Sequence, residues 1–221
     1  FQNTIIKRPK YEPTQGEIRL CKILDEHLPK RFEIYIQPKI DDNRPDIVLV
    51  NQKYGVFIIE IKDWKLERYY KTKDEKGNEH FHKKGFNGEP DIEIGSPLEQ
   101  VMRYHRRLAM YADIHPTKIS YCFYFYNSTT KEARNFVCDD PFTFGNDKDV
   151  DFVKSFSKHT IKDKDLQKDE IARLRQILGP SFHKRQGTMT KLTVQQQNLV
   201  GHKQNTWQKA RGVAGSGKTF V

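Results

Sequence analysis

The feature that most constrains the fold is residues 44–62, RPDIVLVNQKYGVFIIEIK, two apolar runs joined by a polar turn at 51–55. Short runs rich in Val, Ile and Phe predict β-strands, and the turn between them predicts a hairpin. Both faces of the two strands are apolar, so we expect them in the middle of a sheet that helices cover on each side. The chain is therefore expected to adopt an α/β fold.

Three charged residues interrupt this apolar pattern: Asp46 opens the first strand, and Glu60 and Lys62 lie near the end of the second. A turn centred on Lys53 places Asp46 opposite Glu60, where facing Cβ atoms are about 4.5–5.5 Å apart. One divalent cation fits between such carboxylates, and the strand period puts Lys62 on the same face as Glu60. The hypothesis is a metal-dependent nuclease centre. The structural alternative is a buried salt bridge from Lys62 to one acid, which leaves the second carboxylate unexplained.

A helix is expected over residues 14–28, before the hairpin. Thr14 and Glu17 match a capping box, and Leu28-Pro29 ends the helix. Glu17 also heads the apolar stripe of this helix. Two interpretations stay open: Glu17 only caps the helix, or its carboxylate points toward the same site as Asp46.

A second helix is expected over residues 96–113, with Ser96 as N-cap and proline at the first helical position. Gln100 and Tyr104 lie one turn apart and face the same way. A basic stripe on this helix is either a solvated face or a phosphate-binding surface. It consists of Arg103, Arg106 and Arg107.

The other segments complete an α/β pattern. Residues 31–36 and 118–126 predict strands, and the second of these, with the helix before it, makes a β–α–β crossover. Residues 65–95 are polar and predict an exposed hairpin, on which His80 and His82 share a face. That face either binds metal or is simply exposed. A further short strand is expected at 135–138 and a helix at 165–178.

Charge and cysteine content narrow the classes of function. Lys and Arg outnumber Asp and Glu by 39 to 29, for a net charge of +10. This favours nucleic acid as partner, with solubility alone as the alternative. The three cysteines form no CxxC pair, which argues against a disulfide framework and a zinc ribbon and fits a cytoplasmic protein. No apolar run reaches membrane length and no signal peptide opens the sequence.

The composition changes near residue 181. A basic, polar linker is expected at 181–191, and residues 212–219 match the P-loop pattern GxxxxGK[ST]. The main chain of such a loop cradles phosphates, Lys218 reaches the β- and γ-phosphates, and Thr219 binds Mg²⁺. The glycines of this nucleotide-binding motif are Gly212, Gly215 and Gly217. Because the sequence stops at Val221, we expect an incomplete ATPase core, and ATP binding is expected of the full-length protein.

Pro45-Asp46 followed by Glu60-x-Lys62 resembles the PD-(D/E)xK nuclease superfamily. Gln100 and Tyr104 resemble the QxxxY motif of RecB-like nucleases. The arrangement from Gly16-Glu17 to residues 97–100 is similar to the nuclease-related domain called NERD, over about residues 14–127. The resemblance implies a restriction-endonuclease-like core, a central mixed β-sheet flanked by helices.

This resemblance also implies roles for the site residues. Asp46, Glu60 and the Ile61 carbonyl would hold Mg²⁺ or Mn²⁺, and Lys62 would orient or deprotonate water or neutralise developing charge. Glu17 would hold a second metal or a metal-bound water, and Gln100 and Tyr104 would position the DNA strand.

Residues 192–221 resemble the Q-motif and Walker A motif of UvrD/Rep-like superfamily 1 helicases, where Gln196 would contact adenine. We therefore expect an N-terminal arm at 1–12, a nuclease domain at 13–180, the linker, and the first part of a helicase ATPase domain at 192–221.

The leading hypothesis is a metal-dependent DNA nuclease domain of a nuclease–helicase protein. The alternatives are a catalytically silent DNA-binding module and an accessory to an ATPase. DNA repair and anti-phage defence, endo- and exonuclease action, DNA and RNA preference, and a homo-oligomer or partner protein all stay open.

Overall fold

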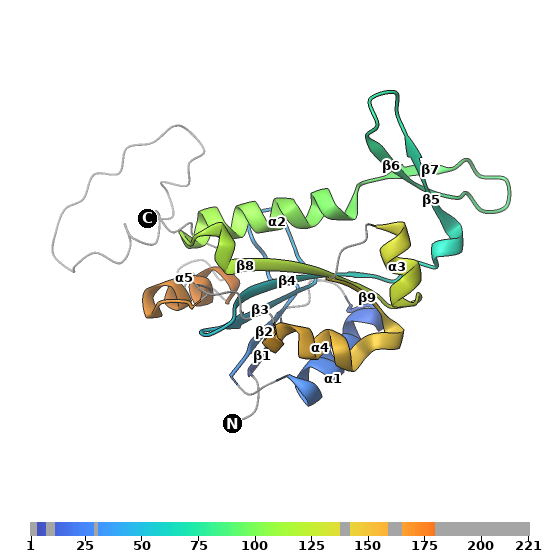
Figure 1. Ribbon diagram of the computed structural model, residues 1–221. Helices are drawn as coiled ribbons and strands as arrows, with labels where there is room; N and C mark the ends of the chain where they lie inside the picture. The colour runs from blue at the N-terminus through green and yellow to red at the C-terminus, as the bar shows by residue number, and fades with distance from the viewer. Residues whose placement is uncertain (1–3, 8–11, 29–30, 138–141, 159–164, 180–221) are drawn as a thin grey trace.

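The computed structural model describes residues 4–7, 12–28, 31–137, 142–158 and 165–179 (Figure 1). Its elements in chain order are β1 (Thr4–Lys7), α1 (Gln15–His27), β2 (Glu33–Ile36), β3 (Ile47–Asn51), β4 (Gly55–Lys62), β5 (Tyr69–Lys73), β6 (Glu79–Lys83), β7 (Ile92–Ile94), α2 (Pro97–Ala112), β8 (Ile119–Phe125), α3 (Thr130–Phe136), β9 (Thr143–Gly145), α4 (Asp149–Lys158) and α5 (Lys168–Leu178). Short 3-10 turns lie at Leu66–Arg68, Pro116–Lys118 and Asn146–Lys148. The expected mixed α/β architecture is confirmed.

The central sheet has the strand order β1-β2-β3-β4-β8-β9. The β3–β4 hairpin pairs Ile47 with Ile59 and Asn51 with Gly55, which is the register expected from a turn centred on Lys53. All residues of both strands are buried except Lys62, which is partly exposed. The hairpin therefore lies in the middle of the sheet, and the charged residues at its end occupy a costly environment.

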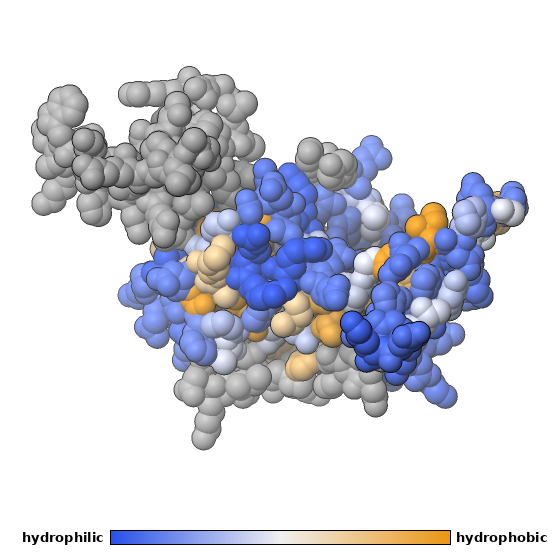
Figure 2. All heavy atoms as spheres, turned by 90° about the horizontal axis from the view of Figure 1, so that it is seen from above, coloured by the Kyte–Doolittle hydropathy of each residue, from blue (hydrophilic) through white to orange (hydrophobic). Residues whose placement is uncertain are grey.

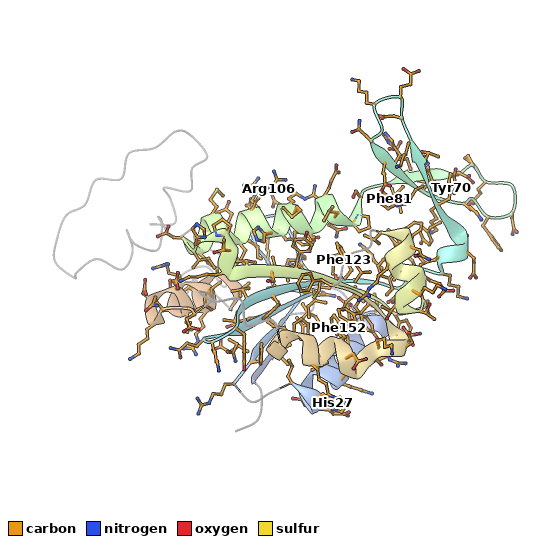
Figure 3. The ribbon with its side chains drawn as sticks, in the orientation of Figure 1. His27, Tyr70, Phe81, Arg106, Phe123 and Phe152 are labelled. Atoms are coloured by element: carbon orange, nitrogen blue, oxygen red, sulfur yellow. The ribbon has the colours of Figure 1, made fainter. Side chains whose placement is uncertain are left out.

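Each face of the sheet has its own apolar core. Residues of α2, α3 and α5 pack on the face that carries Val48 and Ile58, and residues of α1 and α4 pack on the face that carries Leu49 and Ile59. Figure 3 shows Phe123 between the sheet and α2, and Phe152 between the sheet and α4. The alternation of the hairpin residues between two cores is the reason that both of its faces are apolar.

Strand β8 runs parallel to β4 and pairs Phe123 with Glu60, so the expected β–α–β crossover through α2 is confirmed. Helix α2 begins at the Ser96 cap and ends at Asp113, whose φ of 51° is left-handed. The crossover also contains the second sheet, β5-β6-β7, which projects from the body beside the start of α2 (Figure 1). Strand β7 was not expected from the sequence.

Two expectations differ from the structure. The short strand expected at 135–138 is wrong, since residues up to Phe136 belong to helix α3, which Thr129 and Glu132 start with a capping box. Within the expected N-terminal arm, residues 4–7 form edge strand β1, parallel to β2. The pairing of β1 with β2 joins segments distant in sequence, so no local pattern predicts it. The start of α3, in contrast, is marked in the sequence by the capping box of Thr129 and Glu132.

The linker at 181–191 and the segment at 192–221, with Gln196 and the P-loop residues, lie outside the described residues. In the part of the chain that the structure describes, no helix has the length and apolar character needed to cross a membrane.

Candidate active site

Asp46 and Glu60 meet at the end of the central hairpin. The Asp46 Oδ2 atom accepts a hydrogen bond of 2.7 Å from the Ile61 main-chain N–H. Burial raises the pKa of Asp46 well above its usual range, and the neighbouring Glu60 charge adds to this increase. The Ile61 N–H and the strand register therefore hold Asp46 beside Glu60. The proximity of two buried carboxylates destabilises their charged forms.

Glu60 and Lys62 form a partly buried ion pair. The Lys62 Nζ atom lies 2.7 Å from Glu60 Oε1, and the side chains of Lys62 and Glu60 are 12% and 2% exposed. The second carboxylate oxygen, Glu60 Oε2, is buried and has no hydrogen-bond partner in the structure. Burial raises the pKa of Glu60, while the Lys62 ammonium opposes this increase. The salt bridge considered from sequence is thus present, and it satisfies only one oxygen of one acid.

Helix α2 supplies a second hydrogen-bonded partner for Lys62. The Lys62 ammonium donates to Gln100 Oε1 at 3.0 Å, and the Gln100 amide donates to the Tyr104 hydroxyl at 2.7 Å. Burial, followed by the Glu60 charge, raises the pKa of Tyr104 to about 12. Gln100 and Tyr104 thus share one side of the helix, and the chain they form fixes the position of the lysine.

The three arginines of α2 do not act together. All three are exposed, and hydrophilic side chains dominate the outer face of α2 (Figure 2). The positive charge of Arg103 lowers the pKa of Glu60, so Arg103 lies within electrostatic reach of the site. Arg107 instead pairs with Asp41 at 3.8 Å, and Arg106 points away from the sheet (Figure 3). Arg103 therefore contributes positive charge near the carboxylates, whereas Arg107 is paired with Asp41.

Glu17 combines the two interpretations proposed from the sequence. Its Oε2 atom accepts the Thr14 main-chain N–H at 2.7 Å, which completes the capping box of α1. The same carboxylate is buried and accepts hydrogen bonds from Gln37. Its negative charge raises the pKa of both Asp46 and Glu60. Glu17 therefore caps the helix and also contributes negative charge to the site.

Two residues near the site were missed by the sequence analysis. Gln37 contacts both Glu17 and the main chain of Asp46. The Trp64 ring centroid lies 5.2 Å from Lys62 Nζ, and its ring stacks on Tyr69 of β5 at 4.5 Å. The position of Trp64 two residues after Lys62 offered a signal; for Gln37, only the register between β2 and β3 could have provided one.

His80 and His82 share a face of β6, as expected, but each already has partners. His80 contacts Glu93 at 2.7 Å and Asp74 at 3.6 Å, and these contacts raise its pKa, Glu93 first. His82 contacts Thr72 at 2.8 Å. Across the residues described, no group of three or more His, Cys, Asp and Glu side chains is placed to hold a metal ion. The two histidines therefore lie on a partly exposed strand face, each with its own hydrogen-bond partners.

No third His, Cys, Asp or Glu side chain among the described residues lies close enough to Asp46 and Glu60 to complete a metal site. A cation bound by these two acids would therefore need other oxygen ligands. Unsatisfied oxygens are present at this end of the sheet. Among the described residues, four buried side-chain oxygens have no hydrogen-bond partner, and three of the four belong to Gln37, Glu60 and Asp63. Carboxylate and amide oxygens are the ligands that hard cations such as Mg²⁺ prefer. The oxygen atoms of these residues are therefore of the type that suits a divalent cation, and the Ile61 carbonyl, expected from the sequence as a main-chain ligand, belongs to the residue between Glu60 and Lys62.

Comparison with known proteins gives one family match. A family model described as a nuclease-related domain (NERD) matches residues 13–126, just over half of the chain. No curated protein and no solved structure matches the chain.

Proposed function

We propose that this chain, which belongs to the nuclease-related domain family, is a divalent-metal-dependent nuclease that hydrolyses phosphodiester bonds of DNA. The observation that carries the proposal is the Asp46–Glu60 pair beside Lys62, with Glu60 Oε2 buried and unpartnered. A salt bridge that served stability alone would need one acid, whereas this cluster keeps two acids with raised pKa values at the end of the central hairpin. Perturbed groups gathered in this way are typical of functional sites.

Asp46, Glu60 and the Ile61 carbonyl would hold Mg²⁺ or Mn²⁺. When bound, the cation would polarise the phosphoryl oxygen and make an attacking water more acidic. Glu17 is buried next to these groups and adds a negative charge that favours retention of a cation. Its proposed role is to hold a second metal or a water of the first.

Lys62 is the residue best placed to act on the reacting groups. Its ammonium is held between Glu60 and Gln100, and its side chain retains 12% exposure. From this position it would stabilise charge that develops on the phosphoryl group, or hold a proton of the attacking water. The Gln100–Tyr104 chain fixes the lysine on the other side, so its position does not depend on the substrate.

DNA as the substrate is supported by charge. The net charge of +10 attracts a polyanion, and Arg103 lies on the exposed side of α2 within reach of the site. The same arginine supports the second candidate function, a DNA-binding module that does not cut. The two candidates differ in what they require of Lys62, since docking does not need a lysine buried against a glutamate.

Cleavage of single- and double-stranded DNA with Mg²⁺ or Mn²⁺ tests the proposal. We expect cleavage by the wild type, its loss on chelation with EDTA, and its loss in Asp46→Asn and Lys62→Met. Lys118→Met is the matched control, because Lys118 forms a similar partly buried pair with Glu170 at 2.8 Å. DNA binding without cleavage by the wild type under all these conditions would refute the nuclease and favour the binding module.

We also propose that residues 192–221 bind a nucleotide as the first part of a helicase ATPase segment. The support is the sequence pattern alone, with Gln196 and the P-loop that contains Lys218 and Thr219. A fluorescent ATP analogue should bind the chain and should bind less well to Lys218→Ala. Equal binding by both proteins would contradict this proposal.

A further inference from the structure

Gln37 lies at the carboxyl end of β2 and connects two of the acids. Its side-chain Nε2 donates to both carboxylate oxygens of Glu17, at 3.0 and 3.2 Å. Its main-chain N–H donates to the main-chain oxygen of Asp46 at 2.7 Å, and Arg44 donates to its carbonyl at 3.4 Å. Gln37 thus links Glu17 of helix α1 to Asp46, the residue that precedes β3.

The strand register places Gln37 in the same row as the catalytic acids. The last pair of β2 and β3 is Ile36 with Ile47, so Gln37 comes next to Asp46. The same continuation from the pair of Ile47 and Ile59 brings Asp46 next to Glu60. Three oxygen-bearing residues therefore stand side by side at one end of three adjacent strands.

The backbone of Gln37 is held in an unfavourable conformation. Its φ is 46°, in the left-handed region that non-glycine residues seldom adopt. Such a conformation is strained and persists only where the surrounding contacts impose it, often at functional sites. The turn takes Gln37 out of the extended strand, and its side chain contacts Glu17 rather than continuing the strand.

The side-chain oxygen of Gln37 has no hydrogen-bond partner in the structure. A glutamine amide can face a carboxylate only with its nitrogen, so the oxygen must face away from Glu17. Gln37 is only 9% exposed, and this oxygen is buried without a partner. A buried acceptor without a partner destabilises the folded protein, because it has lost its hydrogen bonds to water. If Gln37 served only to hold Glu17, an apolar or hydrogen-bonded group in place of its side-chain oxygen would make the protein more stable. A cation or its hydration water would instead satisfy this oxygen.

We infer that Gln37 is a further metal-site residue, which positions the Glu17 carboxylate through its amide nitrogen and offers its side-chain oxygen to the divalent cation, directly or through a bound water. This inference rests on the proposed function, since it concerns the same cation. It extends the site to β2 and explains why a polar side chain is buried at a strained position between two acids.

Titration of Mn²⁺ into the full chain, followed by calorimetry, tests the inference without reference to cleavage. Gln37→Met keeps the length of the side chain but removes both polar atoms, and we expect 10- to 100-fold weaker binding, the usual effect of losing a group that supports a metal site. Gln37→Glu keeps an oxygen and loses the donor to Glu17. It should lower the thermal midpoint of the metal-free protein and bind Mn²⁺ at least as tightly as the wild type.

Gln52→Met is the matched control, because Gln52 is exposed in the β3–β4 turn at the opposite end of the hairpin. Its Mn²⁺ affinity should equal that of the wild type. Equal affinity of Gln37→Met and wild type would overturn the inference, and so would an equal loss in Gln37→Met and Gln37→Glu, since a purely structural residue behaves in these ways. If the wild type binds Mn²⁺ and Asp46→Ala does not, the proposed site stands whatever Gln37 does. Absence of Mn²⁺ binding by the wild type would overturn both proposals.

Discussion

Replacement of Lys62 by methionine should destabilise the protein in a pH-dependent way. The substitution keeps most of the apolar length of the side chain and removes the ammonium that lies 2.7 Å from Glu60 Oε1 and 3.0 Å from Gln100 Oε1. Glu60, 2% exposed, then loses its positive partner while both of its oxygens stay buried. The prediction therefore concerns the cost of one uncompensated buried carboxylate.

The loss of one partner from a buried ion pair costs about 3–5 kcal/mol. Lys62 is partly exposed and Glu60 can take up a proton, so we expect the lower end of this range, about 3 kcal/mol near pH 8. For a chain of this size, 1 kcal/mol corresponds to roughly 2–4 °C in the thermal midpoint. The expected decrease is therefore roughly 6–12 °C.

The pH dependence follows from the direction of the pKa shift. Burial raises the pKa of Glu60 in the folded protein, and Lys62 opposes this increase, so removal of Lys62 raises it further. A carboxyl with a raised folded pKa contributes stability below its unfolded pKa, and this contribution is lost as the pH rises through the folded value. The penalty of Lys62→Met should thus be smaller at pH 5 than at pH 8.

Thermal unfolding followed by circular dichroism at pH 5, 7 and 8 measures this penalty. The double variant Glu60→Gln/Lys62→Met should recover most of the lost stability without recovering DNA cleavage. The ion pair of Lys118 and Glu170, with side-chain exposures of 18% and 11%, serves for comparison. Lys118→Met is measured alone and together with Glu170→Gln. The reasoning is refuted if the penalty of Lys62→Met does not depend on pH, or if Glu60→Gln does not relieve it.

Three other perturbations have defined outcomes. Asp46→Asn should raise the thermal midpoint more at pH 8 than at pH 5 while abolishing cleavage. The reason is that burial and Glu60 raise the Asp46 pKa and make its ionised form costly. Equal midpoints of the variant and the wild type at pH 8 would contradict this. Tyr104→Phe removes the acceptor of Gln100 and should cost about 1 kcal/mol in urea unfolding, with slower cleavage at unchanged DNA affinity; weaker DNA binding as its main effect would argue against a positioning role. Gly16→Ala should destabilise the folded protein by about 1–3 kcal/mol, because the alanine Cβ would collide with Asp63 Oδ1 and contact Ile61. An unfolding midpoint equal to that of the wild type would contradict the close approach of Asp63 to Gly16.

The sequence was sufficient where the evidence is local. The β3–β4 register, the caps of α1 and α2, and the common side of Gln100 and Tyr104 all follow from short-range periodicity and turn position. These patterns depend on backbone geometry within a few residues, which the order of residue types largely determines. The pairing of Asp46 with Glu60 could be anticipated for the same reason, and helix α3 could have been found from its capping box.

Only the tertiary structure decided which distant groups share the site. Glu17 and Gln37 are 20 positions apart and meet because α1 packs on one face of the central sheet. Trp64 contacts both Lys62 and Tyr69, and the α2 arginines separate, with Arg103 near the acids and Arg107 on Asp41. Such contacts depend on how helices rotate and cross a sheet, and this geometry is set by the packing of the whole core rather than by any local pattern. The central hairpin could thus be predicted from its own residues, but the unpartnered oxygens of Glu60 and Gln37 became visible only once the other elements were in place.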